Sequence, residues 1–193
     1  MNVIIIDYGA GNIQSIQFAL QRLGTTAVLS NNPEVIQSAD KVIFPGVGEA
    51  SQAMQMLKNS RLDALIPNLK QEVLGICLGM QLLCKHSEEG DTKGLGVFDV
   101  NVKRFTNAVK VPHMGWNTIY NQNSDLLINI PQNSYMYSVH SYYAGLTEQT
   151  IASSNYEHEF SAALQSNNFY GVQFHPEKSS KDGSQLLQNF LNL

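Results

Sequence analysis

Two cysteines, one tryptophan and few charged residues set the first limits on this 193-residue sequence. Cys77 and Cys84 are too few for the disulfide framework of a small secreted protein, and we expect both to be free thiols. On one helix they would stand about 10 Å apart, beyond the roughly 7 Å that a disulfide spans. The chain also has no run of about 20 apolar residues, so no membrane-spanning helix is predicted.

The charge balance argues against another group of functions. The chain has 12 Lys and Arg against 16 Asp and Glu, a net charge of −4. A weakly acidic protein is a poor ligand for nucleic acid or an anionic membrane, so neither partner is expected. The start of the chain lacks the basic lead of a signal peptide, which predicts a cytoplasmic protein. No His and Cys residues have metal-ligand spacing, so we predict neither metal nor cofactor.

The sequence does contain enough apolar residues for a core, at 43% of the chain, and we predict one domain spanning residues 1–193. In the first half, apolar runs alternate with stretches of helical periodicity. The expected strands are 3–7, 27–29, 42–44 and 73–76. The expected helices are 13–23, 33–38, 54–69 and 78–86.

The second half is richer in short strand signals. The expected strands are 100–105, 117–120, 135–139, 150–153, 162–165 and 169–174. A hairpin turn is expected at 166–168, because asparagine tolerates positive φ, and a final helix over about 183–193. Alternation builds a mostly parallel sheet between helices on both faces. The prediction is a single-domain α/β fold of three α/β/α layers, with additional antiparallel strands in the C-terminal half.

The sharpest local feature follows the expected strand 73–76. Gly75 and Gly79 flank Cys77 in the pattern G-x-nucleophile-x-G of a nucleophile elbow, where a tight turn leaves no room for neighbouring β-carbons. A thiol at a helix N-terminus gains thiolate character, and the next amide, of Leu78, is placed to help bind an oxyanion. On this motif alone, Cys77 as a small buried core residue stays an equal alternative. Cys84, in an apolar helical stretch, is expected to be a core residue.

A histidine and a carboxylate stand close together near the C-terminus. His175 follows an expected strand, Glu177 comes two residues later, and Pro176 restricts the backbone between them. His175 could take the thiol proton while Glu177 holds the imidazole tautomer, although a purely structural pair remains the alternative. Two further histidines, His113 and His140, could each be a base but have no carboxylate within two residues.

Two other histidines and a glycine-rich segment are also candidate functional groups. His86 and His158 lie in polar stretches and are expected at the surface. The glycine-rich segment 45–48 follows a strand and could cradle a phosphate or present amides to an oxyanion. It lacks the lysine and hydroxyl of a P-loop, which excludes that motif.

These residues resemble a known family. The stretch 75–81 together with 174–177 is similar to the class I glutamine amidotransferases, in the order Cys, His, Glu. Five blocks in the same order, 7–12, 44–48, 112–117, 137–143 and 171–179, resemble the family of glutaminase subunits of imidazole glycerol phosphate synthases. The resemblance covers almost the whole chain, and five ordered blocks make chance agreement improbable.

The resemblance implies a reaction and a set of residues. In this family a thiolate corresponding to Cys77 attacks the glutamine side-chain amide, and residues corresponding to His175 and Glu177 move the proton and orient the base. The matching oxyanion amides are those of Leu78 and Val47. The matching substrate-binding residues are Gly46, Gly48, Gln81, Ser141 and Tyr142.

The resemblance also implies a partner. In this family the ammonia passes within a heterodimer to a (β/α)₈-barrel cyclase subunit, which makes imidazole glycerol phosphate and aminoimidazole carboxamide ribotide in histidine biosynthesis. Trp116, the only tryptophan, looks like an anchor of that interface. The other positions that match the interface are Asn12, Tyr137 and Lys178. The chain departs from the family at Glu49 and Ala50, where Ala-Phe is usual, and has few basic residues around 97–99.

Three alternatives to this function remain at the level of sequence. Close relatives of the family pair with cyclase-like partners that amidate surface sugars, so the ammonia acceptor could differ. A catalytically silent subunit that only binds the barrel is disfavoured by the presence of Cys77, His175 and Glu177 together. A glutaminase of the pyridoxal-phosphate type is disfavoured by the block 112–117.

Overall fold

The computed structural model describes residues 1–9, 11–106 and 108–193, and Ala10 of the expected turn 8–12 lies outside them. A 7-stranded sheet with the order β11-β12-β13-β4-β3-β1-β2 forms the centre of the fold. Its neighbours from β13 to β2 pair in parallel, and β11, β12 and β13 pair antiparallel with one another. The strands are β1 (Val3–Ile6), β2 (Ala27–Ser30), β3 (Lys41–Gly46), β4 (Glu72–Cys77), β11 (Thr150–Asn155), β12 (Glu159–Ser166) and β13 (Phe169–Val172).

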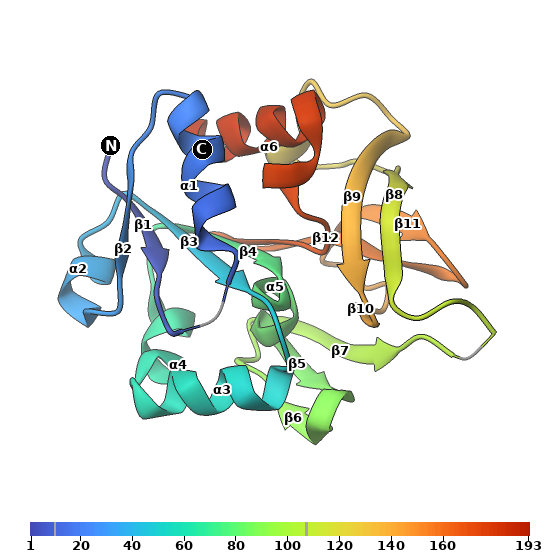
Figure 1. The fold of residues 1–193 in the computed structure, drawn as a ribbon, viewed down its shortest axis with the longest axis horizontal. Coiled ribbons are helices and arrows are strands. Elements are labelled where there is room, and N and C mark those ends of the chain that lie inside the picture. The colour runs from blue at the N-terminus through green and yellow to red at the C-terminus, as the bar shows by residue number, and fades with distance from the viewer. Residues whose placement is uncertain (10, 107) are drawn as a thin grey trace.

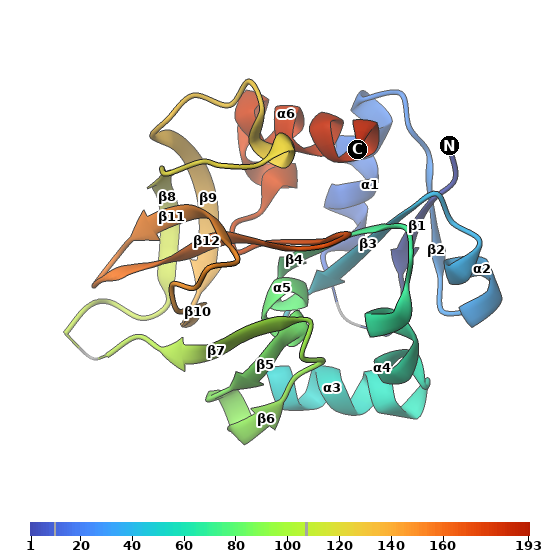
Figure 2. The same ribbon diagram turned by 180° about the vertical axis from the view of Figure 1, so that it is seen from behind.

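Helices cover both faces of this sheet (Figures 1 and 2). On one side lie α1 (Ile13–Arg22) and α6 (Ser180–Asn192), and on the other lie α3 (Ala50–Asn59), α4 (Leu62–Leu65) and α5 (Leu78–Leu83). The short α2 (Pro33–Gln37) follows the edge strand β2. The described residues also form four short 3₁₀ segments: η1 (Ile66–Asn68), η2 (Glu89–Asp91), η3 (Asp125–Leu127) and η4 (Pro176–Lys178).

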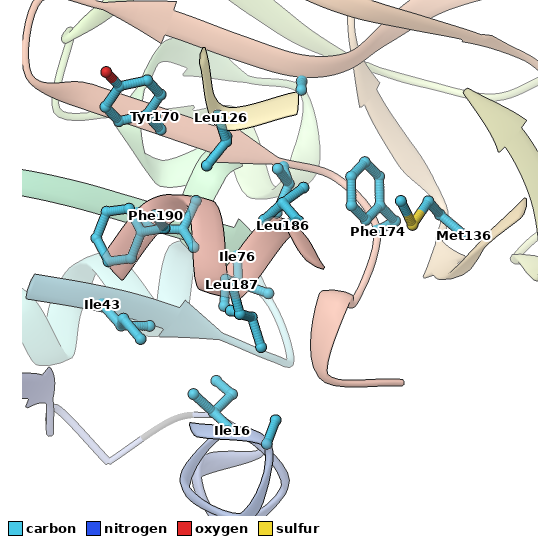
Figure 3. Packing of buried hydrophobic residues seen from close by; sticks show 14 of the residues in the cluster. Ile16, Ile43, Ile76, Leu126, Met136, Tyr170, Phe174, Leu186, Leu187 and Phe190 are labelled. Atoms are coloured by element: carbon cyan, nitrogen blue, oxygen red, sulfur yellow. The ribbon is translucent and has the colours of Figure 1, made fainter. Parts of the chain in front are cut away.

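The apolar run of β1 shows why both faces of the sheet must be covered by other elements. Successive side chains of a strand point to opposite faces. Val3 and Ile5 pack into one buried cluster, while Ile4 and Ile6 pack into a second. Figure 3 shows the first cluster, in which Leu187 and Phe190 of α6 lie over the sheet near Ile43. The predicted three-layer α/β fold is therefore confirmed.

Two smaller sheets flank the central one. A 4-stranded sheet has the order β10-β7-β5-β6, and β8 pairs antiparallel with β9 to form a two-stranded ribbon. The ribbon is bridged to β11 through Tyr120 and Ser153. The strands are β5 (Cys84–Ser87), β6 (Thr92–Lys93), β7 (Phe98–Arg104), β8 (His113–Ile119), β9 (Ser134–His140) and β10 (Tyr142–Ala144).

The expected helix 78–86 is wrong in its second half, because α5 ends at Leu83 and β5 begins at Cys84. The carbonyls of Leu82, Leu83 and Cys84 accept hydrogen bonds from the amides of residues 95, 97 and 96. Those carbonyls are thus paired with a distant segment instead of with a following helical turn. The one-helix distance between the two cysteines therefore does not apply, although both thiols are free as expected, and both are buried.

Other boundaries differ by a few residues. The third strand extends through Pro45 to Gly46, the block 112–117 lies mostly in β8, and the last helix starts three residues early. The strands β5, β6 and β10 were not expected. The hairpin between β12 and β13 is confirmed, with Asn167 at a φ of 51°. In the part of the chain that the structure describes, no helix has both the length and the apolar composition needed to cross a bilayer.

We predict that Gly79→Ala destabilises the fold by about 3 kcal/mol or more, because core overpacking against fixed backbone has no flexible side chain to absorb it. A β-carbon on Gly79 would collide with the carbonyl oxygen of Phe44 in β3. Gly145→Ala is the matched control, since its β-carbon would meet Val100 at an ordinary 4.0 Å. Urea unfolding of both variants measures the difference, and equal midpoints would contradict the prediction.

Candidate active site

The candidate site lies at the carboxyl edge of three neighbouring parallel strands. In the order β13-β4-β3, the central strand ends at Cys77, and the register places Cys77 opposite Gly46 of β3. His175 follows the end of β13 on the other side of β4. Ligands bind at this edge of open α/β sheets because the strands deliver their following loops to one place. A cavity of about 410 Å³ opens there and is lined by both Cys77 and His175.

The backbone at Cys77 has the geometry of a nucleophile elbow. Its φ of 54° and ψ of −112° are strained for a residue with a β-carbon, and α5 begins at the next residue. Helix and strand approach so closely that a β-carbon on Gly75 would lie 2.9 Å from the amide nitrogen of Met80. The expected strand, turn and helix are thus present, with glycine where side chains have no space.

His175 and Glu177 form a buried pair beside this turn. The His175 Nδ1 lies 2.9 Å from Glu177 Oε1, and the two side chains are 7% and 0% exposed. A carboxylate oxygen accepts, so Nδ1 carries a hydrogen and Nε2 is the nitrogen left for the thiol. Among the described residues, Glu177 Oε2 has no hydrogen-bond partner. The carboxylate therefore directs its hydrogen bonding to the imidazole alone.

The surroundings of His175 favour its charged form. Burial lowers the pKa of the imidazole, but hydrogen bonds and charge from Cys77 and Glu177 outweigh burial and raise the pKa to about 10. Tyr8 is also buried nearby, and burial together with the charge of Cys77 raises the pKa of its phenol. A charged imidazole beside a cysteine is the kind of surrounding in which reactive cysteines are found.

A serine missed by sequence reasoning anchors the His-Pro-Glu turn. Ser179 is almost completely buried, and its hydroxyl donates to the carbonyl of His175 at 2.6 Å and accepts from the amide of Tyr137 at 2.9 Å. The amide of His175 donates in turn to the Tyr137 carbonyl at 2.8 Å. The turn is thereby attached to β9. The sequence did contain a signal for this contact, because a serine just after a turn often hydrogen-bonds to nearby backbone groups.

The side-chain amide of Gln81 is hydrogen-bonded to other polar groups inside the protein. Its Nε2 donates to the carbonyl of Tyr142 and to Oε1 of Gln173, each at 2.9 Å. Gln173, which sequence reasoning also missed, has its own Nε2 3.9 Å from the Cys77 sulfur. A buried glutamine between apolar residues could have been noticed, because buried amides need partners.

The expected oxyanion groups lie at the cavity, but Gly46 does not line it. Leu78 begins α5, and Val47, 42% exposed, and Gly48, at a φ of 94°, line the cavity from the loop after β3. Gly46 instead packs against the Gly79 backbone and the Tyr8 hydroxyl. The other expected substrate residues, Gln81, Ser141 and Tyr142, do line the cavity.

A glutamate missed by sequence reasoning also lines the cavity. Glu89 Oε2 accepts the Ala50 amide at 2.9 Å at the start of α3, and burial is the first cause that raises the pKa of this carboxyl. The neighbouring Glu49 is one of the departures from the family pattern. Its carboxylate accepts from Ser51 at 2.6 Å and Gln52 at 3.0 Å in the same helix. Helix N-termini favour such carboxylates.

The competing histidines have other hydrogen-bond partners, although His140 also lines the cavity. His113 and His140 are buried and bond to each other at 3.1 Å, with no carboxylate partner among the described residues. Burial lowers the pKa of His140 to about 3, so it is neutral at physiological pH. His158 is exposed as expected, whereas His86 is half-buried and pairs with Asp91 at 2.8 Å. Residues 1–9, 11–106 and 108–193 contain no cluster of three or more potential metal ligands.

Two of the expected interface residues, Trp116 and Tyr137, lie on one face of the ribbon. Trp116 is 53% exposed and packs on Tyr137 with ring centroids 5.9 Å apart. Met114 and Tyr135 are exposed on the same face of the ribbon, by strand alternation. Lys178 is exposed at the cavity. Asn12 precedes α1 and accepts the Ser15 hydroxyl at 3.0 Å.

Residues 4–193 match the family model described as glutamine amidotransferase class-I. The chain belongs to this family. Solved structures agree on the fold: a crystal structure of a glutamine amidotransferase superposes with a TM-score of 0.76 at 18% identity, covering 99% of this chain and 98% of that one. The structure of PurLQS from Thermotoga maritima superposes with a TM-score of 0.73 at 16% identity, covering 99% of this chain and 97% of that one.

Curated proteins give a narrower likeness. Imidazole glycerol phosphate synthase subunit HisH of Bacteroides thetaiotaomicron is 55% identical over 196 residues, covering 100% of both chains. The subunit HisH of Yersinia pseudotuberculosis is 47% identical, again covering 100% of both. The resemblance to the glutaminase subunits of that synthase, expected from the five blocks, is therefore confirmed.

We predict that His175 remains an imidazolium at pH 8 and deprotonates near pH 10, whereas His140 is already neutral at pH 5. Because the folded pKa of His175 exceeds the ordinary 6.5, its contribution to stability is complete below pH 6.5 and is lost as pH rises through about 10. Nitrogen NMR of the imidazole rings measures both midpoints. Glu177→Gln should lower the His175 midpoint, and a wild-type midpoint near 6.5 would contradict this assignment.

Proposed function

We propose that this chain hydrolyses glutamine with Cys77 as the nucleophile and supplies the ammonia to a cyclase subunit in histidine biosynthesis. The observation that carries the proposal is the strained elbow at Cys77, which shares one cavity with the buried His175–Glu177 pair. The full-length likeness to HisH subunits of imidazole glycerol phosphate synthase supports the same reaction. Residues 1–193 act as one glutamine amidotransferase domain.

The first chemical step is attack of the Cys77 thiolate on the side-chain amide carbon of glutamine. A C–S bond forms, and the carbonyl π electrons move to oxygen. His175 then gives its proton to the amide nitrogen, the C–N bond breaks, and ammonia leaves a γ-glutamyl thioester. Glu177 keeps the imidazole oriented and compensates its positive charge.

The second step returns the enzyme to its starting state. Water, deprotonated by His175, attacks the thioester carbon, and the C–S bond breaks to release glutamate and the thiolate. Each step passes through a tetrahedral oxyanion, which the Leu78 amide at the start of α5 and the Val47 amide hold. Val47 belongs to the exposed glycine-flanked loop after β3, so its amide becomes available when that loop adjusts.

The cavity also has groups for the amino-acid end of glutamine. Glutamine carries an α-ammonium and an α-carboxylate, which need partners of opposite charge or hydrogen-bond donors. Glu89 supplies an anionic group, and Gly48, Ser141 and Tyr142 line the same cavity and complete the pocket. This pocket distinguishes glutamine from simple amides that lack both charged groups.

The partner in this proposal is a (β/α)₈-barrel cyclase that forms a heterodimer with this chain. It uses the ammonia to make imidazole glycerol phosphate and aminoimidazole carboxamide ribotide. The names of the relatives support a subunit role. The exposed face around Trp116 and Tyr137 supplies the aromatic anchors that protein interfaces favour, and we assign Asn12 and Lys178 to the same interface from the family resemblance.

We predict that Cys77→Ser lowers glutamine turnover in the complex with the cyclase by about 10³-fold or more, because a serine hydroxyl is not activated by this pair as a thiolate is. Cys84→Ala, which removes the other buried thiol, should leave turnover within about twofold. Glutamate release measures both, and mass spectrometry of rapidly quenched protein detects the thioester on Cys77. Normal turnover by Cys77→Ser would refute the nucleophile.

We predict that Trp116→Ala raises the dissociation constant for the cyclase by about 30-fold, as loss of an aromatic hot spot does. Val28→Ala is the control, because Val28 is an equally exposed apolar residue on β2, at the opposite edge of the sheet order from the ribbon. Titration calorimetry compares the two variants. A dissociation constant unchanged by Trp116→Ala would remove this face from the proposed interface.

A further inference from the structure

The inner face of the β8–β9 ribbon carries two buried histidines that the proposed chemistry does not use. His113 and His140 stand opposite each other in the register of the ribbon and are 5% and 6% exposed. Phe105 packs edge-on to His113 at 6.5 Å and tilted to His140 at 5.4 Å, while Tyr156 stacks on His113 at 4.0 Å. Two imidazoles in an aromatic cluster require a hydrogen-bonding reason to be there.

The hydrogen bonds of the pair have only one consistent direction. His140 Nδ1 lies 2.7 Å from the carbonyl oxygen of Tyr142, and a carbonyl only accepts, so Nδ1 carries the hydrogen. In the neutral ring His140 Nε2 is then an acceptor, and it receives the hydrogen of His113 Nδ1 at 3.1 Å. The remaining nitrogen, His113 Nε2, is an acceptor 3.5 Å from the side-chain nitrogen Nδ2 of Asn117.

The carbonyl at the end of this chain of hydrogen bonds also holds a residue of the cavity. The Tyr142 oxygen accepts Gln81 Nε2 at 2.9 Å, and the second hydrogen of that nitrogen goes to Gln173 Oε1 at 2.9 Å. Both donors of the Gln81 amide are therefore used inside the protein. What Gln81 can offer a ligand in the cavity is its acceptor, Oε1.

Resting on the proposed glutaminase function, we propose that His140, supported by His113, is a positioning residue for glutamine. It fixes the Tyr142 carbonyl, which holds the Gln81 amide so that Oε1 accepts an N–H of the substrate. Without the His140 donor, the Tyr142 carbonyl loses one of the two side-chain hydrogen bonds that it accepts. The Gln81 amide can then turn and present N–H groups, which are the wrong hydrogen-bonding type for an N–H donor.

Two substitutions of His140 separate positioning from packing. His140→Phe keeps an aromatic ring in the cluster and removes the donor, whereas His140→Asn keeps a donor at the place of Nδ1 and loses most of the ring. For His140→Phe in the complex with the cyclase we expect the KM for glutamine to rise about tenfold while kcat changes by less than about threefold, as for one lost binding hydrogen bond. For His140→Asn we expect a KM within about threefold of the unmodified protein.

Two further variants are needed, one as a control and one as a replacement test. His158→Phe removes a histidine from the same aromatic cluster, where its Nε2 lies 2.6 Å from the Tyr143 hydroxyl and 3.9 Å from Glu157 Oε2, and should leave KM unchanged. His113→Phe keeps the stack on Tyr156 but removes the donor to His140, so it should raise KM by about threefold. It replaces His140→Phe as the test if the latter does not fold.

Alkylation of Cys77 provides a readout that a general loss of structure would not produce. With His140→Phe, we expect a glutamine-like electrophile to react about tenfold more slowly, while iodoacetamide, which needs no glutamine pocket, reacts at the unmodified rate. Equal KM values for His140→Phe and the unmodified protein, or a larger effect of His140→Asn than of His140→Phe, would overturn the inference alone. Failure of the unmodified complex to hydrolyse glutamine would overturn the proposed function and this inference together.

Discussion

The parallel pairing of β4 between β3 and β13 is the constraint on which the rest of the site depends. It places the end of β4, at Cys77, beside the loop that follows β3 and beside the segment that carries His175. Each of these groups is contributed by a different part of the chain, separated by tens of residues. Because ladder hydrogen bonds fix the register of neighbouring strands, the thiol and the imidazole meet although they are far apart in the sequence.

Close backbone packing and local hydrogen bonds then determine the conformation of the turns that carry Cys77 and His175. The absence of a side chain at Gly79 lets α5 approach the carbonyl of Phe44, and Cys77, just before this helix, has a positive φ of 54°. On the other side, Ser179 attaches the His-Pro-Glu turn to β9. The same strand ends at His140, so His175 and the cavity-lining residues Ser141 and Tyr142 share one support. Strain at the nucleophile is thus held by satisfied hydrogen bonds around it.

Sequence reasoning predicted most of what depends on local patterns. The apolar runs located the parallel strands, and the glycines around Cys77 located the elbow, since both signals are contained in a few neighbouring residues. The helix 78–86 was extended too far because the carbonyls at its end are taken by residues 95–97, which no local pattern reveals. Glu89, Gln173 and Ser179 were missed for a related reason. Each is an ordinary polar residue whose importance comes from which distant groups it contacts.

The sequence by itself determined the alternation of strands and helices, the two free cysteines and the family to which the chain belongs. Those properties follow from side-chain periodicity, glycine placement and short motifs, which are local. Only the tertiary structure decided which nitrogen of His175 faces the thiol and why its pKa is raised. It also decided that Gly46 packs behind the cavity and that Gln81 has both its donors occupied. Hydrogen-bond direction and burial depend on partners brought together by folding, and no stretch of sequence contains both members of such a pair.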